Sequence, residues 1–177
     1  RAEGVTIHTQ LSGTYNFSNC AVAVLIGKHF DIPLEEIKKA LEGYVPENNR
    51  SQLIEKKNLQ IILDAYNANP SSMEVALRHL GSLKTGRKIA ILGDMFELGE
   101  DSEKEHQAIA DLGTSLGIDK LYLVGRAFSG IQTDAEQFGT FADLSAFLKA
   151  NPIIGPATLL IKASRGMALE RVLEYIG

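Results

Sequence analysis

The sequence has little of what several classes of protein require. Its 177 residues include a single cysteine, Cys20, so the chain can form neither a disulfide framework nor a cysteine-based metal site. Its 18 basic and 22 acidic side chains give a formal net charge of −4, which leaves no broad basic field for nucleic acid. Apolar runs are too short for a membrane span or a secretory signal. We therefore expect a cytoplasmic protein that neither binds nucleic acid nor inserts into membranes.

Two further features are missing. The sequence contains no Gly-x-x-x-x-Gly-Lys-Ser/Thr loop of the kind that cradles nucleotide phosphates. Its four histidines are scattered without the spacing of metal ligands, so we predict no metal site. The chain also begins at Arg1 rather than at a methionine, and we expect it to be a piece of a longer protein.

Hydrophobic patterning predicts a helical part, a linker and a larger remainder. Residues 15–30 carry apolar side chains at helical spacing, and a second helix is expected over 34–41. The stretch 44–50 is polar and contains a proline and two asparagines, which is typical of a linker. With 45% hydrophobic and 23% charged residues overall, the chain is expected to bury a packed core rather than to be disordered.

After the linker, short β-type runs alternate with helix-forming segments. Strands are expected at residues 59–63, 88–92, 121–124, 138–141 and 158–161, and helices at 70–83, 102–116, 142–150 and 167–175. Strands without polar alternation are buried on both faces and are covered by crossover helices. The pattern therefore predicts an α/β fold with a Rossmann-like, mostly parallel sheet flanked by helices. Residues 51–57 are expected to add an antiparallel edge strand.

Polar residues follow the expected strands, where open parallel sheets bind their ligands. Asp64 ends an apolar run, and its carboxylate can either accept hydrogen bonds from a ribose diol or cap a turn. Lys162, Ser164 and Arg165 follow the last strand. They offer a cation, a hydroxyl and backbone donors to a ligand carboxylate, or else they form a surface turn.

Three more polar positions are candidates for ligand contacts. Asn16 and Asn19 are three residues apart at the start of the first helix, so they share one helical face and either bind the edge of a base or cap the helix. Arg50 ends the linker and either contacts a phosphate or ribose or is solvated. Asn69 and Pro70 are expected to open a helix as its cap and its first residue.

In order and spacing, these segments resemble the Mur ligases. The resemblance is carried by Gly13-x-Tyr15-Asn16-x-x-Asn19, Arg50, the run from Asp64 to Met73, the run from Leu92 to Gly99, and Lys162-x-Ser164-Arg165. It spans nearly the whole chain, and the two long runs are typical of the members that add D-alanyl-D-alanine. One position departs from the family, which usually has glycine where this sequence has Ala163; the close backbone approach that glycine permits is therefore in question.

The resemblance implies an ATP-dependent, amide-forming ligase that uses ATP and Mg²⁺. Such an enzyme joins D-alanyl-D-alanine to UDP-N-acetylmuramoyl-tripeptide through an acyl phosphate, in peptidoglycan precursor synthesis. Residues 1–45 would be the tail of the central ATPase domain, a helical remnant, and residues 46–177 the carboxy-terminal Rossmann-like domain. The partners implied are the rest of the central domain, an amino-terminal UDP-substrate domain and small-molecule substrates. Without the phosphate-binding loop, the piece alone is expected to be inactive and to hold no nucleotide tightly.

The same resemblance implies roles for individual residues. Asn16 and Asn19 would face adenine, while Arg50 and Asp64 would hold the ribose and phosphate side of ATP. The D-alanyl-D-alanine site would include Asn67, Asn69, Lys162 and Ser164, with the loop at residues 93–99 nearby. No catalytic residue and no metal ligand is implied within the chain.

Two other functions compete with the ligase. Asp64 and Asp94 at strand ends, with Lys162 after the last strand, also imitate the acidic cluster and lysine of a receiver-like, phospho-accepting signalling domain. That hypothesis leaves the two asparagines of the first helix unexplained. The other alternative is a nucleotide-binding or scaffolding domain without chemistry.

Overall fold

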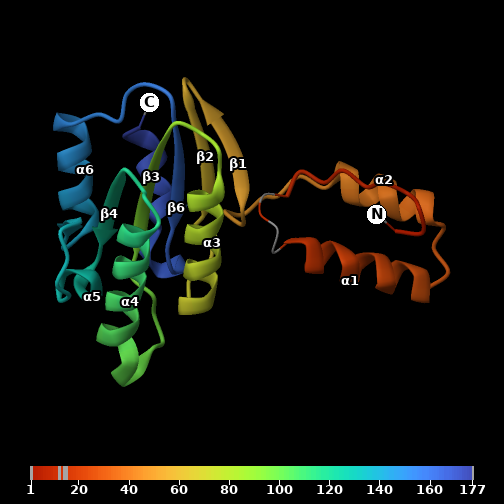
Figure 1. The fold of residues 1–177 in the computed structure, drawn as a ribbon, viewed down its shortest axis with the longest axis horizontal. Helices are drawn as coiled ribbons and strands as arrows, with labels where there is room; N and C mark the ends of the chain where they lie inside the picture. Colours follow the sequence, from red (N-terminus) through yellow and green to blue (C-terminus); the bar gives the residue numbers. More distant parts are fainter. Residues whose placement is uncertain (1, 12, 14–15, 177) are drawn as a thin grey trace.

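The protein consists of a six-stranded sheet with helices on both faces and a pair of helices set apart at the far end of a linker (Figure 1). A computed structural model describes residues 2–11, 13 and 16–176. Thr14 and Tyr15, which belong to the predicted asparagine segment, lie outside the described residues. The sheet confirms the predicted α/β fold.

The sheet is parallel except at one edge. Its strands are β1 (Gln52–Lys56), β2 (Leu59–Asp64), β3 (Arg87–Gly93), β4 (Lys120–Val124), β5 (Glu136–Phe138) and β6 (Ala157–Lys162). They lie in the order β1-β2-β6-β3-β4-β5, with β1 antiparallel to β2 and every other neighbouring pair parallel. The antiparallel edge strand predicted over 51–57 is therefore confirmed. The strand predicted at 138–141 instead ends at Phe138, because Thr140 already caps the next helix.

Most of the predicted helices are present. They are α1 (Asn16–His29), α2 (Leu34–Gly43), α3 (Pro70–Ser82), α4 (Ser102–Ser115), α5 (Arg126–Ser129) and α6 (Phe141–Ala150), with the 3-10 segments η1 (Gly99–Asp101), η2 (Arg165–Met167) and η3 (Leu169–Glu174). The prediction of one continuous helix over 167–175 is wrong, because this part of the chain is 3-10 helical and interrupted. Ala168 adopts a left-handed conformation with φ of 46°, and this interrupts the helix, so the segment forms two short 3-10 turns.

The start of α3 follows the sequence prediction closely. The Asn69 side chain accepts a hydrogen bond from the Ser72 N–H at 2.9 Å, and the Ser72 hydroxyl accepts one from the Asn69 N–H at 3.1 Å. Pro70 is the first helical residue, where its missing N–H costs no hydrogen bond. This capping box fixes the loop that leads from β2 into α3.

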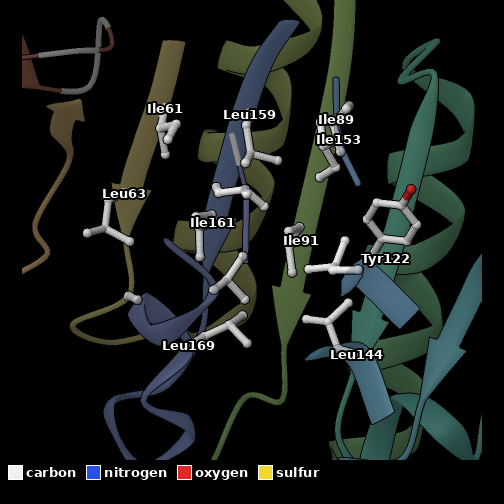
Figure 2. Close-up of a cluster of buried hydrophobic side chains, with 14 of the residues drawn as sticks. Ile61, Leu63, Ile89, Ile91, Tyr122, Leu144, Ile153, Leu159, Ile161 and Leu169 are labelled. Carbon is white, nitrogen blue, oxygen red and sulfur yellow. The ribbon is translucent and has the colours of Figure 1, made fainter. Parts of the chain in front are cut away.

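The core has two layers because successive side chains of a buried strand point to opposite faces. On one face, Ile61, Leu159 and neighbouring strand residues pack against α6 and η3, as Figure 2 shows for Leu144 and Leu169. On the other face, Ile62 and neighbouring strand residues pack against α3, α4 and α5. Every residue of β6 is buried. Because β6 lies between β2 and β3 and is parallel to both, the carboxyl ends of these three strands lie side by side.

The two amino-terminal helices form a small unit of their own. They meet closely at Gly27, where a Cβ would lie 2.7 Å from Cδ1 of Ile37. Much of the apolar surface of this unit is uncovered: Phe17, Leu25 and Phe30 are 69%, 67% and 70% exposed. Within the described part of the chain, no helix combines the length and apolarity needed to cross a membrane.

Candidate functional site

A cavity of about 500 Å³ lies between the start of α1, the linker and the carboxyl ends of β2 and β6. Its lining consists of Leu11, Asn16, Asn19, Tyr44, Arg50, Ser51, Asp64, Tyr66, Asn67, Asn69, Ser72 and Lys162. The volume is within the range of small-molecule sites, about 300–1,000 Å³. Of the eight residues to which the family resemblance gives ligand-binding roles, seven therefore share one cavity, and Ser164 is the exception.

An ion pair forms the floor of the cavity. The Lys162 ammonium, only 2% exposed, donates to Oδ2 of Asp64 at 2.5 Å and to the Asn67 carbonyl oxygen at 3.2 Å. The strands set this pair, because Asp64 and Lys162 are in register across β2 and β6. Since an ammonium carries three N–H donors, these two contacts leave one donor of Lys162 for a ligand in the cavity that it lines.

Asp64 also fastens the linker to the sheet. Its Oδ1 accepts hydrogen bonds from the Ser51 N–H at 3.0 Å and from the Ser51 hydroxyl at 3.5 Å. Ser51 is buried and has φ of 46°, a left-handed conformation that few residues other than glycine adopt. The turn-stabilising role that the sequence allowed for Asp64 is thus present, and the carboxylate also lies in the cavity wall.

The two asparagines of α1 lie at the opposite wall. The Asn19 side chain donates through Nδ2 to Oδ1 of Asn16 at 3.0 Å. Asn16 is buried while Asn19 is exposed, so the bond anchors the orientation of the more exposed carboxamide. Together they bring amide donors and acceptors to the cavity, which is the chemistry needed at a base edge.

Arg50 lines the cavity and lies over an aromatic ring. Its Cζ atom is 3.7 Å from the centroid of the Tyr66 ring. Tyr66 belongs to the run from Asp64 to Met73 that carries the family resemblance, but no role was predicted for it. The sequence signal that could have pointed to Tyr66 is an aromatic residue two positions after the strand-end Asp64. The fold is needed to show that this ring contacts Arg50.

Ser164 lies outside the cavity lining and ties loops together. Its hydroxyl accepts from the Phe96 N–H at 2.9 Å and donates to the Ala68 carbonyl at 3.5 Å, and its own N–H donates to the Asp94 carbonyl at 3.2 Å. Arg165 is also outside the lining, and its guanidinium lies 3.7 Å from Glu170. The structure therefore brings Lys162 to the cavity but leaves Ser164 and Arg165 behind it.

The asparagines after β2 are partly committed to structure. Asn67 gives its carbonyl oxygen to Lys162, while Asn69 gives its side-chain oxygen to the cap of α3. Both side chains are nevertheless exposed in the cavity lining. The loop at residues 93–99 does not reach the lining.

The carboxylate of Asp94 is engaged in hydrogen bonds within the fold, which bears on the receiver-like signalling alternative. Its carboxylate accepts hydrogen bonds from the Ala127 and Phe128 N–H groups, both at 3.1 Å. Lys162 pairs with Asp64 instead. Across the described residues, no three His, Cys, Asp or Glu side chains cluster as a metal site would require. The acidic cluster on which the receiver-like alternative depends is therefore not formed by the part of the chain that the structure describes.

His106, one of the four histidines, is a packing residue. It is fully buried, and its Nε2 accepts from the Met95 N–H at 3.0 Å. Nδ1 lies 2.6 Å from the Ser102 carbonyl oxygen, so the neutral tautomer with a proton on Nδ1 satisfies both contacts. The edge of the ring also packs against Phe128.

Ala163, the position that departs from the family pattern, is accommodated by a neighbouring glycine. The Ala163 side chain is fully buried, and a Cβ built on Gly93 would lie only 2.7 Å from its methyl group. The absence of a side chain at Gly93 on the adjacent strand thus leaves room for the Ala163 methyl group. Lys162 keeps its place in the cavity.

Comparison with known proteins gives the same relatives by sequence and by structure. The family model described as "Mur ligase, glutamate ligase domain" matches residues 49–165. The chain is 33% identical over 180 residues to the UDP-N-acetylmuramoyl-tripeptide--D-alanyl-D-alanine ligase of Bacillus subtilis (strain 168), covering 96% of this chain and 39% of that protein. The ligase of the same name from Escherichia coli (strain K12) is 30% identical over 177 residues, with coverages of 97% and 39%.

Among solved structures, MurF from Acinetobacter baumannii superposes with a TM-score of 0.79 at 30% identity, covering 95% of this chain and 38% of that one. The chain thus spans about 39% of the length of the curated relatives. Because the family model matches more than half of the chain and the fold agrees, the chain belongs to the Mur ligase family.

Proposed function

We propose that this chain is the carboxy-terminal part of a cytoplasmic, ATP-dependent ligase that joins D-alanyl-D-alanine to UDP-N-acetylmuramoyl-tripeptide. The observation that carries the proposal is the single cavity lined by Asn16 and Asn19 on one side and by Arg50, Asp64 and Lys162 on the other. The relatives that match nearly the whole chain bear the name of this ligase.

The nucleotide would lie between the helical unit and the sheet. Asn16 and Asn19 carry the amide donors and acceptors that suit the adenine edge. Arg50 supplies a cation for the phosphates, and the Asp64 carboxylate accepts hydrogen bonds from the ribose hydroxyls. A site divided between two parts of a molecule closes only when both are held together, so binding depends on the whole protein.

The incoming dipeptide would approach Lys162. The remaining N–H donor of this buried ammonium attracts the dipeptide carboxylate, since charged hydrogen bonds in a desolvated site are strong. The exposed amides of Asn67 and Asn69 lie close by in the same lining. These groups hold the dipeptide so that its amine can attack the acyl phosphate of the tripeptide, with phosphate as the leaving group.

The rest of the chemistry belongs to other parts of the enzyme. This sequence has no phosphate-binding loop, and its described residues form no cluster able to hold a metal ion. We therefore assign no Mg²⁺ ligand to this chain. The piece alone would be catalytically inactive.

The helical unit supports the division into two domains. A helix that is apolar on most sides is normally buried in a larger structure, yet Phe17, Leu25 and Phe30 are largely exposed. Phe17 and Leu25 line an apolar hollow of about 440 Å³, together with residues such as Ile7 and Leu41. We propose that residues 1–45 complete the central ATPase domain of the full protein and that residues 46–177 form the carboxy-terminal domain.

The test is an activity assay on the complete ligase, meaning this chain joined to the amino-terminal part expected ahead of it. Phosphate release from ATP should require both D-alanyl-D-alanine and the UDP-tripeptide, and this chain alone should release none. A matched control replaces the dipeptide with D-glutamate. If the complete protein prefers glutamate or a folate, the substrate assignment is wrong; if it binds ATP without turnover, the chain belongs to a binding protein rather than to an enzyme.

A further inference from the structure

The Arg50–Tyr66 stack is a feature of the cavity that the proposed roles do not explain. The guanidinium lies over the Tyr66 ring at 3.7 Å. Among the described residues, Arg50 takes part in no hydrogen bond and no ion pair. Its five N–H donors therefore remain available to a ligand, and the ring is the group that holds its position.

Tyr66 can hold Arg50 because its own loop is fixed. The neighbouring Ala65 and Ala68 are buried. The carbonyl oxygen of Asn67 accepts from Lys162, and that of Ala68 accepts from the Ser164 hydroxyl. Before Tyr66, Asp64 pairs with Lys162, so the ring projects from a segment fastened on both sides to the residues at the end of β6, whereas Arg50 is carried by the linker.

The stack lies where the loss of the Tyr66 ring would let Arg50 turn away from the cavity. A second hollow of about 670 Å³ adjoins the cavity, and the two share Tyr44, Arg50 and Tyr66 in their linings. Glu47 lines the second hollow. Without the ring, the long Arg50 side chain is free to turn toward this carboxylate and away from the cavity.

We propose that Tyr66 is a positioning residue, whose ring holds the Arg50 guanidinium so that its N–H donors face an anionic ligand in the cavity. The inference rests on the proposed function, in which that ligand is the phosphate chain of ATP. Stacking suits this task because the ring contacts the face of the guanidinium while the N–H donors lie in its plane. The Tyr66 hydroxyl has no part in the mechanism, so phenylalanine should replace tyrosine without loss.

The experiment measures the dissociation constant for ATP by calorimetry in the complete ligase. Tyr66→Leu should weaken ATP binding about two- to five-fold, the size of one cation–π contact at an exposed site, while Tyr66→Phe should bind as the parent does. In an Arg50→Met background, Tyr66→Leu should have no further effect. The urea midpoint of unfolding should stay unchanged in Tyr66→Leu, which separates positioning from a general loss of structure.

A matched control is available elsewhere in the molecule. Arg171 lies over the Phe141 ring at 4.1 Å, outside the cavity lining, so Phe141→Leu removes a comparable stack and should leave ATP affinity unchanged. If the parent binds ATP and Tyr66→Leu binds equally well, or if the loss persists at full size without Arg50, the role of Tyr66 is overturned. A parent enzyme that binds no ATP overturns the proposed function, and the role of Tyr66 with it.

Discussion

At the scale of single residues, the Asp64–Lys162 pair does the most to shape the site. Both partners are removed from water to different degrees: the Lys162 side chain is 2% exposed and that of Asp64 is 17% exposed. Each side chain therefore neutralises a partner charge whose burial would otherwise be unfavourable, but Lys162 depends on Asp64 more than Asp64 depends on Lys162. Asp64 keeps the Ser51 N–H if the lysine is removed, whereas Lys162 would keep only a carbonyl oxygen if the carboxylate were removed.

This inequality predicts different costs for two substitutions. Asp64→Asn should lower the free energy of unfolding by about 3–5 kcal/mol, because it leaves a buried ammonium without its counter-charge. Lys162→Met should cost about half as much, since the remaining carboxylate is partly hydrated and still hydrogen-bonded. Urea unfolding followed by circular dichroism measures both. Equal costs, or a larger cost for Lys162→Met, would show that the burial of the pair has been misjudged.

A second prediction at this scale concerns pH. Burial lowers the pKa of His79 from its ordinary value of 6.5, so the folded state favours the neutral ring more than the unfolded state does. The stabilisation is present above pH 6.5 and is lost as pH falls through the lowered folded-state pKa. His79→Gln should therefore flatten the decline in stability between about pH 7 and about pH 5. Unfolding midpoints across that range test this, and parallel curves for the two proteins would contradict it.

Sequence alone could name the cavity residues better than it could describe their roles. Asp64 and Lys162 could be singled out as strand-end residues, because parallel strands end at the same edge of a sheet, whereas Asn16 and Arg50 needed the family resemblance as well as their places at a helix start and at the end of the linker. The link from Asp64 to Ser51 could not be predicted, since it depends on a left-handed serine in an irregular linker. The placement of Ser164 behind the cavity depends on which loops meet there, and periodicity carries no information about that.

At the scale of elements, the contact between β3 and β6 explains how the strand ends approach each other. Gly93 and Ala163 follow the last paired residues of the two strands, and the Ala163 methyl occupies the space that a side chain on Gly93 would need. Leu169 of η3 closes the same space, at 3.3 Å from the position of such a Cβ. A glycine on one strand therefore allows a methyl group on the other.

The contact predicts a compensating pair of substitutions. Gly93→Ala should lower the free energy of unfolding by about 1–3 kcal/mol through overpacking, and adding Ala163→Gly should recover most of the loss. Gly86→Ala is a matched control, because a Cβ there meets no atom within 4 Å. A double-mutant cycle from urea unfolding gives the coupling. Additive effects of the two substitutions would rule out the contact.

Elements with strong periodicity could be predicted, and those determined by tertiary contacts could not. The Asn69-Pro70 signal located the start of α3 to the residue, and apolar runs located β2, β3 and β6. The four-residue α5 gave no periodic signal, and the backbone N–H groups at its start are held by Asp94 from another strand end. The 3-10 turns at the carboxy terminus likewise depend on the left-handed Ala168.

At the scale of the whole molecule, the cavity exists only because two parts of the chain meet. The asparagines come from the start of α1 in the helical unit, whereas Asp64 and Lys162 come from strands of the sheet (Figure 1). The linker between them contains Asn48 and Asn49, and Ser51 follows it directly; all three have positive φ. A ligand bound between the two parts would contact both of them, so its affinity would depend on their relative position as well as on the residues of the lining.

A structure of the complete protein with a non-hydrolysable ATP analogue would show directly whether the nucleotide binds in this cavity. We expect the adenine at Asn16 and Asn19, the ribose at Asp64, and the phosphates within hydrogen-bonding reach of Arg50. An analogue bound elsewhere, or bound here without contact to Arg50 and Asp64, would contradict the central claim that these groups form one nucleotide site.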